Sequence, residues 1–243
     1  MICRSRTLAV GALATIALSA CGALPAGPSE LPSTWAPSAS PEPLPSEDVA
    51  SDFGFTRAQE ASARVRNHAC DGYGTGSAFA IDEHTFVTNR HVVENQYDLE
   101  LTAYDGRDLT VVSSQIAPSV DLALITVAES VDVTLSLATT GVAKGTSLTI
   151  VGYPEGGEMT TTKGSVIDIV DDVIENEGQV FQTDVLIKHG SSGSPTINGE
   201  GDVIGIAYAG DDLNYSYIIP VARLQELLGD RSLLRDNPVA CDL

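Results

Sequence analysis

Short runs in which apolar residues alternate with polar or small residues recur along the chain from about residue 53 onward. Because successive side chains of a β-strand point to opposite faces, this alternation predicts strands that each bury one face. Turn-forming pairs such as Asp105-Gly106, Lys144-Gly145 and Asn198-Gly199 separate the runs. Strands are therefore expected at residues 78–81, 97–101, 109–112, 122–127, 147–151, 165–170, 180–183, 203–206 and 215–219.

The alternating pattern fills one region, residues 53–243, which is the size of a single domain. One short helical pattern, residues 221–228, follows the last run, and the region contains no internal repeat. Many short strands with few helices indicate an all-β sandwich or a pair of barrels. The strand pattern alone does not choose between these two architectures.

Residues 1–20 have the composition of an export signal. Arg4 and Arg6 precede an uncharged run, residues 7–20, which is too short to span a bilayer comfortably. The run ends at Leu18-Ser19-Ala20-Cys21, which resembles the lipobox of bacterial lipoproteins. The resemblance implies cleavage before Cys21 and attachment of a lipid to its sulfur. An ordinary cleaved signal, or an uncleaved anchor with an incidental cysteine, is the alternative. Under each of these interpretations the protein is exported, so an extracytoplasmic location at a bacterial cell membrane is expected.

The segment between this signal and the domain, residues 21–52, is rich in Pro and Ser. Seven of the chain's twelve prolines lie between Cys21 and Ser46. Such a segment cannot bury enough apolar surface to offset the entropy lost on ordering. We therefore expect a disordered tether that holds the domain away from the lipid.

The remaining cysteines fit an exported domain. Cys3 would leave with the signal and Cys21 would carry lipid, so Cys70 and Cys241 remain. Pairing of these two would tie the first strand to the C-terminal tail. Two free thiols are the alternative, because a sequence does not show the geometry that a disulfide needs.

The formal net charge of −20 argues against nucleic acid or anionic lipid as a partner. Acidic residues gather in one segment, and their oxygen atoms are of the type that Ca²⁺ prefers. The spacing is not that of a known calcium loop, so a solvated acidic hairpin is the preferred interpretation and no metal is expected. These residues are Asp168, Asp171, Asp172, Glu175 and Glu177.

Three polar residues stand in contexts suited to nucleophilic catalysis. They are His91 in TNRHVV (residues 88–93), Asp121 at the start of DLAL (121–124) and Ser192 in GSSGSP (190–195). A serine hydroxyl is a weak nucleophile at neutral pH, so it needs an imidazole to take its proton and a carboxylate to orient that imidazole. An α/β-hydrolase is disfavoured, because that fold uses Gly-x-Ser-x-Gly and places its histidine last.

These contexts, together with GTGSAF (residues 74–79), GYP (152–154) and QTD (182–184), resemble the bacterial trypsin-like proteases of the chymotrypsin clan. The nearest resemblance is to the HtrA/Deg protease domain and the glutamyl endopeptidases, from about Val65 to Pro220. It implies an all-β fold of two antiparallel six-stranded barrels that meet at a cleft, followed by a short C-terminal helix. No PDZ module is expected after that helix.

The resemblance also implies a role for each site residue. Ser192 would be the nucleophile, His91 the general base and then the general acid, and Asp121 the carboxylate that orients His91. The backbone N–H groups of Gly190 and Ser192 would form the oxyanion hole. Asp98, Asp105 and Asp108 are alternatives for the acid, but only Asp121 opens the apolar run that the family places beside the histidine. His189 is expected at the rim of the cleft.

Specificity is inferred from positions near the nucleophile. The polar residues that read glutamate in the glutamyl endopeptidases are replaced here by Ile187 and Ala207, and the position where an Asp would select Arg or Lys is Leu186. An apolar wall therefore predicts small or medium apolar side chains at the cleaved position. The expected wall consists of Leu186, Ile187, Ile206, Ala207 and Tyr208.

The sequence as a whole predicts an exported, lipid-anchored serine endopeptidase that acts on peptides or proteins through an acyl-enzyme and needs no cofactor. It would contact the membrane through the lipid on Cys21 and would not bind nucleic acid. The alternative is a catalytically idle relative that binds peptides or surface proteins in the same cleft. A structural lipoprotein of the cell wall would require all three motifs to be coincidental.

Overall fold

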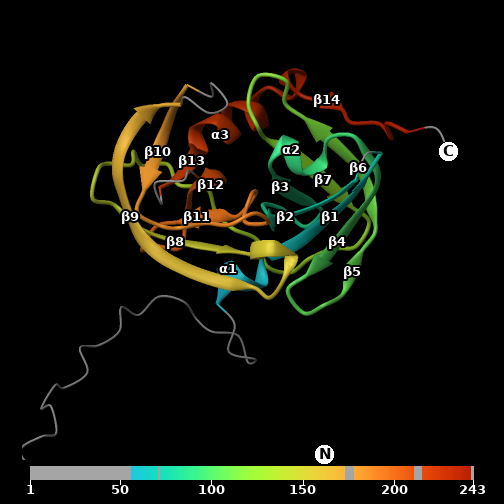
Figure 1. Cartoon of the computed structure of the whole chain (residues 1–243), viewed down its shortest axis with the longest axis horizontal. Coiled ribbons are helices and arrows are strands. Elements are labelled where there is room, and N and C mark those ends of the chain that lie inside the picture. Colours follow the sequence, from blue (N-terminus) through green and yellow to red (C-terminus); the bar gives the residue numbers. More distant parts are fainter. Residues whose placement is uncertain (1–55, 71, 173–177, 211–214, 242–243) are drawn as a thin grey trace, which may run out of the picture. The chain divides into compact units, whose positions relative to one another are not determined.

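The computed structural model describes residues 56–70, 72–172, 178–210 and 215–241. The predicted signal, Cys21 and the tether up to residue 52 lie outside these residues. The predicted all-β class is confirmed, because a closed six-stranded barrel lies beside a second antiparallel sheet (Figure 1). Within the described residues, no helix is long and apolar enough to cross a membrane.

The first sheet carries most of the N-terminal half of the described chain. Its strand order is β14-β6-β7-β3-β2-β1-β4-β5, and its pairs are antiparallel. The family resemblance implied a six-stranded barrel here. The sheet contains six longer strands, and β5 and β14 add two residues each at its two edges, which makes eight strands. The strands are β1 (Ser62–Ala69), β2 (Gly72–Ala80), β3 (Thr85–Thr88), β4 (Gln96–Ala103), β5 (Asp108–Leu109), β6 (Val111–Ile116), β7 (Ala123–Val127) and β14 (Arg235–Asp236).

The closed barrel follows in the order β10-β13-β12-β11-β8-β9. Its interior is filled by apolar side chains that alternate along the strands, among them Ile150, Phe181 and Ile218. A short helix, α3 (Val221–Gly229), follows the last barrel strand as predicted. The strands are β8 (Ser147–Gly152), β9 (Thr160–Asp171), β10 (Gln179–Thr183), β11 (Pro195–Ile197), β12 (Val203–Gly210) and β13 (Ser216–Pro220).

All nine predicted strand regions overlap strands of the structure, with one break. The run at residues 109–112 divides between β5 and β6 at Thr110. There the Glu129 carboxylate accepts hydrogen bonds from the Thr110 backbone N–H and hydroxyl, both at 2.7 Å. The Glu129 side chain thus takes the place of a neighbouring strand as the hydrogen-bond acceptor for the Thr110 N–H.

The pattern does not predict β1, β3, β11 or β14. Strand β1 buries Ala63, Val65 and Asn67 on one face. Because Asn67 is polar, the sequence of β1 does not show the usual alternation of apolar and polar residues. Strand β11 has three residues, too few for a period to be visible.

The predicted disulfide is confirmed. Cys70 follows β1, and its bond to Cys241 joins residues 171 positions apart, with their Cα atoms 5.6 Å from each other. Because Cys241 lies after α3 and the closed barrel, the bond links the end of the chain to the first sheet.

Candidate active site

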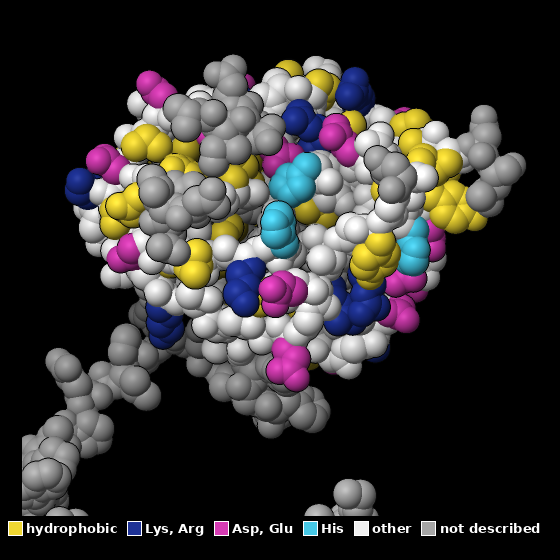
Figure 2. Space-filling model, in the orientation of Figure 1, with side chains coloured by type: hydrophobic (Ala, Val, Ile, Leu, Met, Phe, Trp, Pro, Cys, Tyr) yellow, Lys and Arg dark blue, Asp and Glu magenta, His cyan; other side chains and the backbone are white. Residues whose placement is uncertain are grey.

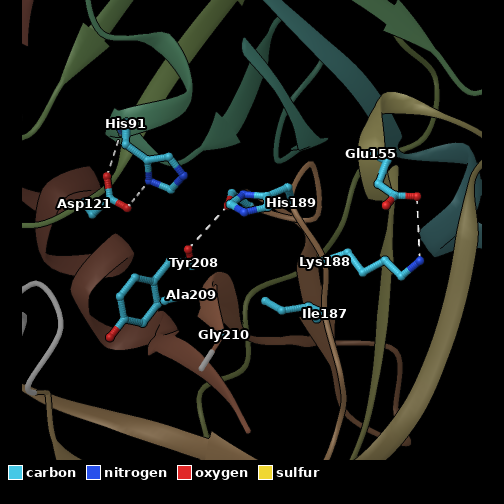
Figure 3. Close-up of a pocket in the computed structure, with 10 residues that line it drawn as sticks. His91, Asp121, Glu155, Ile187, Lys188, His189, Tyr208, Ala209 and Gly210 are labelled. Carbon is cyan, nitrogen blue, oxygen red and sulfur yellow. Dashed lines mark hydrogen bonds and ion pairs between the residues drawn. The ribbon is translucent and has the colours of Figure 1, made fainter. Parts of the chain in front are cut away.

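His91 lies in α2 (Arg90–Val93), a single turn of helix directly after β3. Asp121 lies in the turn before β7 and is buried, with 1% of its surface exposed. One Asp121 oxygen accepts the His91 backbone N–H at 2.9 Å, and the other lies 2.6 Å from His91 Nδ1 (Figure 3). The Asn89 side chain donates to the Asp121 carbonyl at 2.7 Å. The carboxylate therefore fixes both the helix and the ring of the histidine.

None of the alternative acids pairs with His91 in the contacts of the described residues. Asp98 lies opposite His68 in the pairing of β1 with β4. Asp105 accepts from Arg107, and Asp108 accepts from the Thr102 hydroxyl. The structure thus brings together the histidine and the acid that the family resemblance selected.

Ser192 lies in the loop between β10 and β11. Its hydroxyl donates to the Tyr208 carbonyl at 3.3 Å, and its own carbonyl accepts the Ser77 N–H at 2.8 Å. The next residue, Gly193, has a φ of +87°, and a Cβ there would collide with the Ser77 carbonyl. Only glycine therefore lets the loop lie against β2.

Gly190 is also required by its surroundings. Its φ is +86°, and a Cβ would lie 2.5 Å from the Tyr153 carbonyl and 2.7 Å from the Glu155 nitrogen. The carbonyl before it, that of His189, accepts the Glu155 N–H. Since C=O and N–H point in opposite directions in a trans peptide, the Gly190 N–H points away from the loop between β8 and β9.

The residue that supplies this hydrogen bond, Glu155, has a strained backbone. It lies in the 3₁₀ turn η2 (Pro154–Gly156) with a φ of 58°, in the left-handed region that a non-glycine residue occupies at a cost of about 1–2 kcal/mol. The loop is also held by the Ser77 hydroxyl, which donates to the Gly190 carbonyl at 2.8 Å and accepts the Tyr153 N–H at 2.9 Å. Ser77 in β2 thus holds both the loop between β8 and β9, which contains Tyr153, and the loop between β10 and β11, which contains Gly190.

His91, Asp121 and Ser192 line one recess of about 700 Å³ (Figure 3). His189 lines it as well, as predicted for a residue at the rim of the cleft. A second recess of about 590 Å³ shares His91, His189 and Ser192 and extends over Gly72, Tyr73 and Gly74. His91, His189 and Ser192 therefore lie at the junction of the two recesses.

The predicted specificity wall is only partly present in the recess. Ile187 and Tyr208 line it. Leu186 is 53% exposed and lines a separate recess of about 220 Å³. Ile206 and Ala207 have no exposed surface, because successive side chains of β12 alternate between two buried clusters.

The recess is also lined by four residues that the sequence analysis did not indicate. They are Glu155, Lys188, Ala209 and Gly210. Lys188 Nζ lies 3.6 Å from a Glu155 carboxylate oxygen, so an exposed ion pair borders the recess. Lys188 could have been found by its place beside the nucleophile loop. Glu155 could not have been found in this way, because it lies in a loop more than thirty residues before Ser192 in the chain.

A buried tyrosine lies under the same loop. Arg64 lies over the Tyr153 ring at 5.9 Å and donates to the Gly156 carbonyl at 3.3 Å. Burial raises the pKa of Tyr153 to about 12. Its hydroxyl has no hydrogen-bond partner among the described residues.

Histidine side chains lie near the centre of one face, and acidic side chains are scattered over that face (Figure 2). In the acidic segment, Asp168 lies 3.5 Å from Lys144 Nζ, whereas Glu175 and Glu177 lie outside the described residues. The part of the chain that the structure describes contains no group of three or more His, Cys, Asp or Glu side chains that could hold a metal ion.

Comparison with known proteins agrees with this geometry. Residues 75–206 match the family model of the trypsin-like peptidase domain. The chain belongs to the trypsin-like peptidase family. Similar trypsin-like peptidases include rat "Serine protease HTR4", 30% identical over 168 residues, which cover 64% of this chain and 34% of that protein. Another is a "Probable periplasmic serine endoprotease DegP-like" from Hahella chejuensis, 31% identical over 160 residues, which cover 62% and 34%.

Solved structures of trypsin-like peptidases share the fold. The active form of the Rv3671c protease from M. tuberculosis has a TM-score of 0.64 at 22% identity, over 74% of this chain and 83% of that one. The HtrA-type protease AlgW with tripeptide has a TM-score of 0.64 at 24% identity, over 71% and 60%. The chain spans about a third of the length of the curated relatives it matches.

Proposed function

We propose that this protein is a serine endopeptidase in which Ser192 is the nucleophile, His91 the general base and Asp121 the orienting carboxylate. The observation that carries the proposal is the 2.6 Å contact of His91 Nδ1 with buried Asp121, in the recess that Ser192 also lines. This contact leaves Nε2 as the ring nitrogen that accepts a proton.

The reaction would proceed in two halves. The Ser192 hydroxyl exchanges the Tyr208 carbonyl for His91 Nε2, loses its proton to that nitrogen and attacks the peptide carbonyl carbon. The N–H groups of Gly190 and Ser192 stabilise the oxyanion, and His91 returns the proton to the leaving amine. Water, activated by the same histidine, then hydrolyses the acyl-enzyme and releases the new carboxylate.

Active-site labelling tests the assignment. A fluorophosphonate forms a bond only with an activated serine, so wild-type protein should be labelled and Ser192→Ala should not. Ser191→Ala is the matched control, because it changes the adjacent hydroxyl and should retain labelling. Labelling that persists in Ser192→Ala would refute Ser192 as the nucleophile. A wild type that binds peptides without being labelled would favour the alternative of a catalytically idle peptide-binding protein.

The proposed specificity is for small or medium apolar side chains at the cleaved position. Ile187 and Tyr208 support it, since both line the recess beside Ser192. Cleavage-site profiling with a peptide library checks this preference. Strong cleavage after Arg, Lys or Glu would contradict it.

We also propose that the protein is exported and anchored by a lipid on Cys21, with residues 21–52 as the tether. The sequence context of Cys21 and the relatives named as periplasmic support this location. Membrane fractions of cells that express the full chain should contain it, and Cys21→Ser should move it to the soluble fraction. Equal membrane association of both forms would refute the anchor.

A further inference from the structure

The chain returns to the first sheet after α3. Beyond the 3₁₀ turn η3 (Arg231–Leu233), strand β14 pairs with β6, the Ala240 N–H donates to the Gln96 carbonyl at 2.8 Å, and Cys241 bonds to Cys70. Figure 1 shows this red segment passing the helix α2. We refer to residues 234–241 as the C-terminal strap.

Asn237 is the buried residue of the strap that contacts α2. Its side chain donates to the Val93 carbonyl at 2.9 Å and to the Ser114 hydroxyl at 3.1 Å. Its backbone is fixed on both sides, because its N–H donates to the Ser114 carbonyl at 3.0 Å and its carbonyl accepts from the Gln96 amide at 2.5 Å. The amide group is therefore held in place against the last residue of α2.

Asn67, in the first strand of the described chain, also donates to carbonyls at the end of α2. It lies in β1, is 3% exposed, and donates to the Val92 carbonyl at 3.0 Å and the Glu94 carbonyl at 2.9 Å. The two asparagines together satisfy three consecutive carbonyls at the C-terminal end of α2.

These carbonyls need external partners. The last four carbonyls of any helix have none within the helix, and α2 contains only four residues. A helix this short is not stable by itself, because one turn fixes several dihedral angles for a single hydrogen bond. The position of α2 therefore depends on its contacts with the rest of the fold, among them those with Asn67, Asn237 and Asp121.

We propose that Asn67 and Asn237 are positioning residues for His91, and that the C-terminal strap acts on the histidine through Asn237 alone. This inference rests on the proposed function. Loss of either amide would let α2 move relative to Asp121, and a misplacement of about 1 Å in a catalytic group can cost on the order of 100-fold in rate. The end of the chain would thus control the histidine without touching substrate.

The test is Asn237→Ala in the full chain, assayed at a temperature where the variant is folded. We expect kcat to fall by about 10- to 100-fold, with KM within a factor of about two because the recess walls are unchanged. Asp236→Ala, an exposed neighbour in the strap, should retain wild-type kcat. Ser62→Ala is the matched stability control, because it loses a buried 2.7 Å hydrogen bond to the Ala58 carbonyl far from α2. It should lower stability and leave kcat unchanged.

A second measurement needs no substrate. The proton between His91 Nδ1 and Asp121 should give a strongly deshielded NMR resonance in the wild type, because their contact is short. Asn237→Ala should move this resonance upfield or broaden it, whereas Ser62→Ala should not. If Asn237→Ala does not fold, Asn237→Asp keeps the volume and removes the N–H donors.

Each outcome is decisive. An active wild type with unchanged kcat and an unchanged resonance in the Asn237 variant would overturn the positioning role. A wild type that neither hydrolyses peptides nor accepts the fluorophosphonate would refute the proposed function, while the resonance would still show whether the strap positions His91.

Discussion

At the scale of single residues, Asp121 holds His91 through both of its carboxylate oxygens. One oxygen accepts the His91 backbone N–H and the other lies against His91 Nδ1. An amide at this position could keep one contact, but it would place an N–H or a neutral oxygen against the ring and no longer stabilise an imidazolium.

We therefore expect Asp121→Asn to reduce kcat by a factor on the order of 10³ to 10⁴, with the fold intact. Steady-state hydrolysis of a peptide that the wild type cleaves measures the loss. Asp105→Asn is the control, because Asp105 pairs with Arg107 away from the recess. Equal losses in the two variants would show that the effect is not specific to the histidine.

Gly190 gives a second prediction at this scale. Gly190→Ala would place a methyl group against the Tyr153 carbonyl and the Glu155 nitrogen, so the peptide that carries the proposed oxyanion donor must shift. Loss of one such donor lowers kcat by about 10²- to 10³-fold. Gly201→Ala is the matched control, since Gly201 has a φ of +84° and nothing within 4 Å of the place that a methyl group would take. It should retain kcat and lose only stability, as measured by urea denaturation.

At the scale of elements, the loop between β8 and β9 begins with a buried tyrosine, Tyr153. Because burial raises the pKa of Tyr153 to about 12, the folded protein holds the phenol proton more tightly than the unfolded chain. This contribution to the free energy of unfolding is complete below the unfolded pKa of about 10. It is lost as the pH rises from about 10 towards 12.

Tyr153→Phe should consequently flatten the alkaline fall in stability. At pH 7 it should change the free energy of unfolding by less than about 1 kcal/mol, because the lost hydroxyl has no partner among the described residues. Urea denaturation between pH 7 and pH 11 measures the difference from wild type. Tyr73→Phe, at a side chain that is 59% exposed, serves as the control. A large loss at pH 7 for Tyr153→Phe would reveal a hydrogen bond to this hydroxyl.

At the scale of the whole molecule, one covalent bond joins the end of the chain to the first sheet. The disulfide closes a loop of 171 residues, and the loss of unfolded-chain entropy for so long a loop is about 5 kcal/mol in the simple model. Measured effects are commonly smaller, so we expect Cys70→Ser to lower the free energy of unfolding by about 2–5 kcal/mol.

Denaturation in urea without reductant checks this value. Cys241→Ser should give the same loss, and the double variant no more, because either change removes the same bond. Additive losses would instead indicate that each cysteine side chain stabilises the fold through its own packing.

The alternation of apolar and polar residues located nine strand regions, and the local contexts of His91, Asp121 and Ser192 indicated the candidate catalytic residues. Both signals are local, since a strand has a period of two and a catalytic residue lies in a short motif. The disulfide is not local, but its prediction needed only a count of the cysteines in a domain that was expected to be exported.

Only the tertiary structure decided which side chains border the recess and what holds the histidine. Leu186, Ile206 and Ala207 were expected in the wall, but Leu186 lies in a separate recess and the other two are buried. Glu155 lines the recess from a distant loop, and Asn237 reaches α2 from the far end of the chain. The sequence by itself predicted most of the strands, the candidate catalytic residues and the cysteine pair. Which residues lie beside the candidate catalytic residues depends on which loops come together after folding and on which face of its strand each side chain lies. A local sequence pattern predicts neither of these.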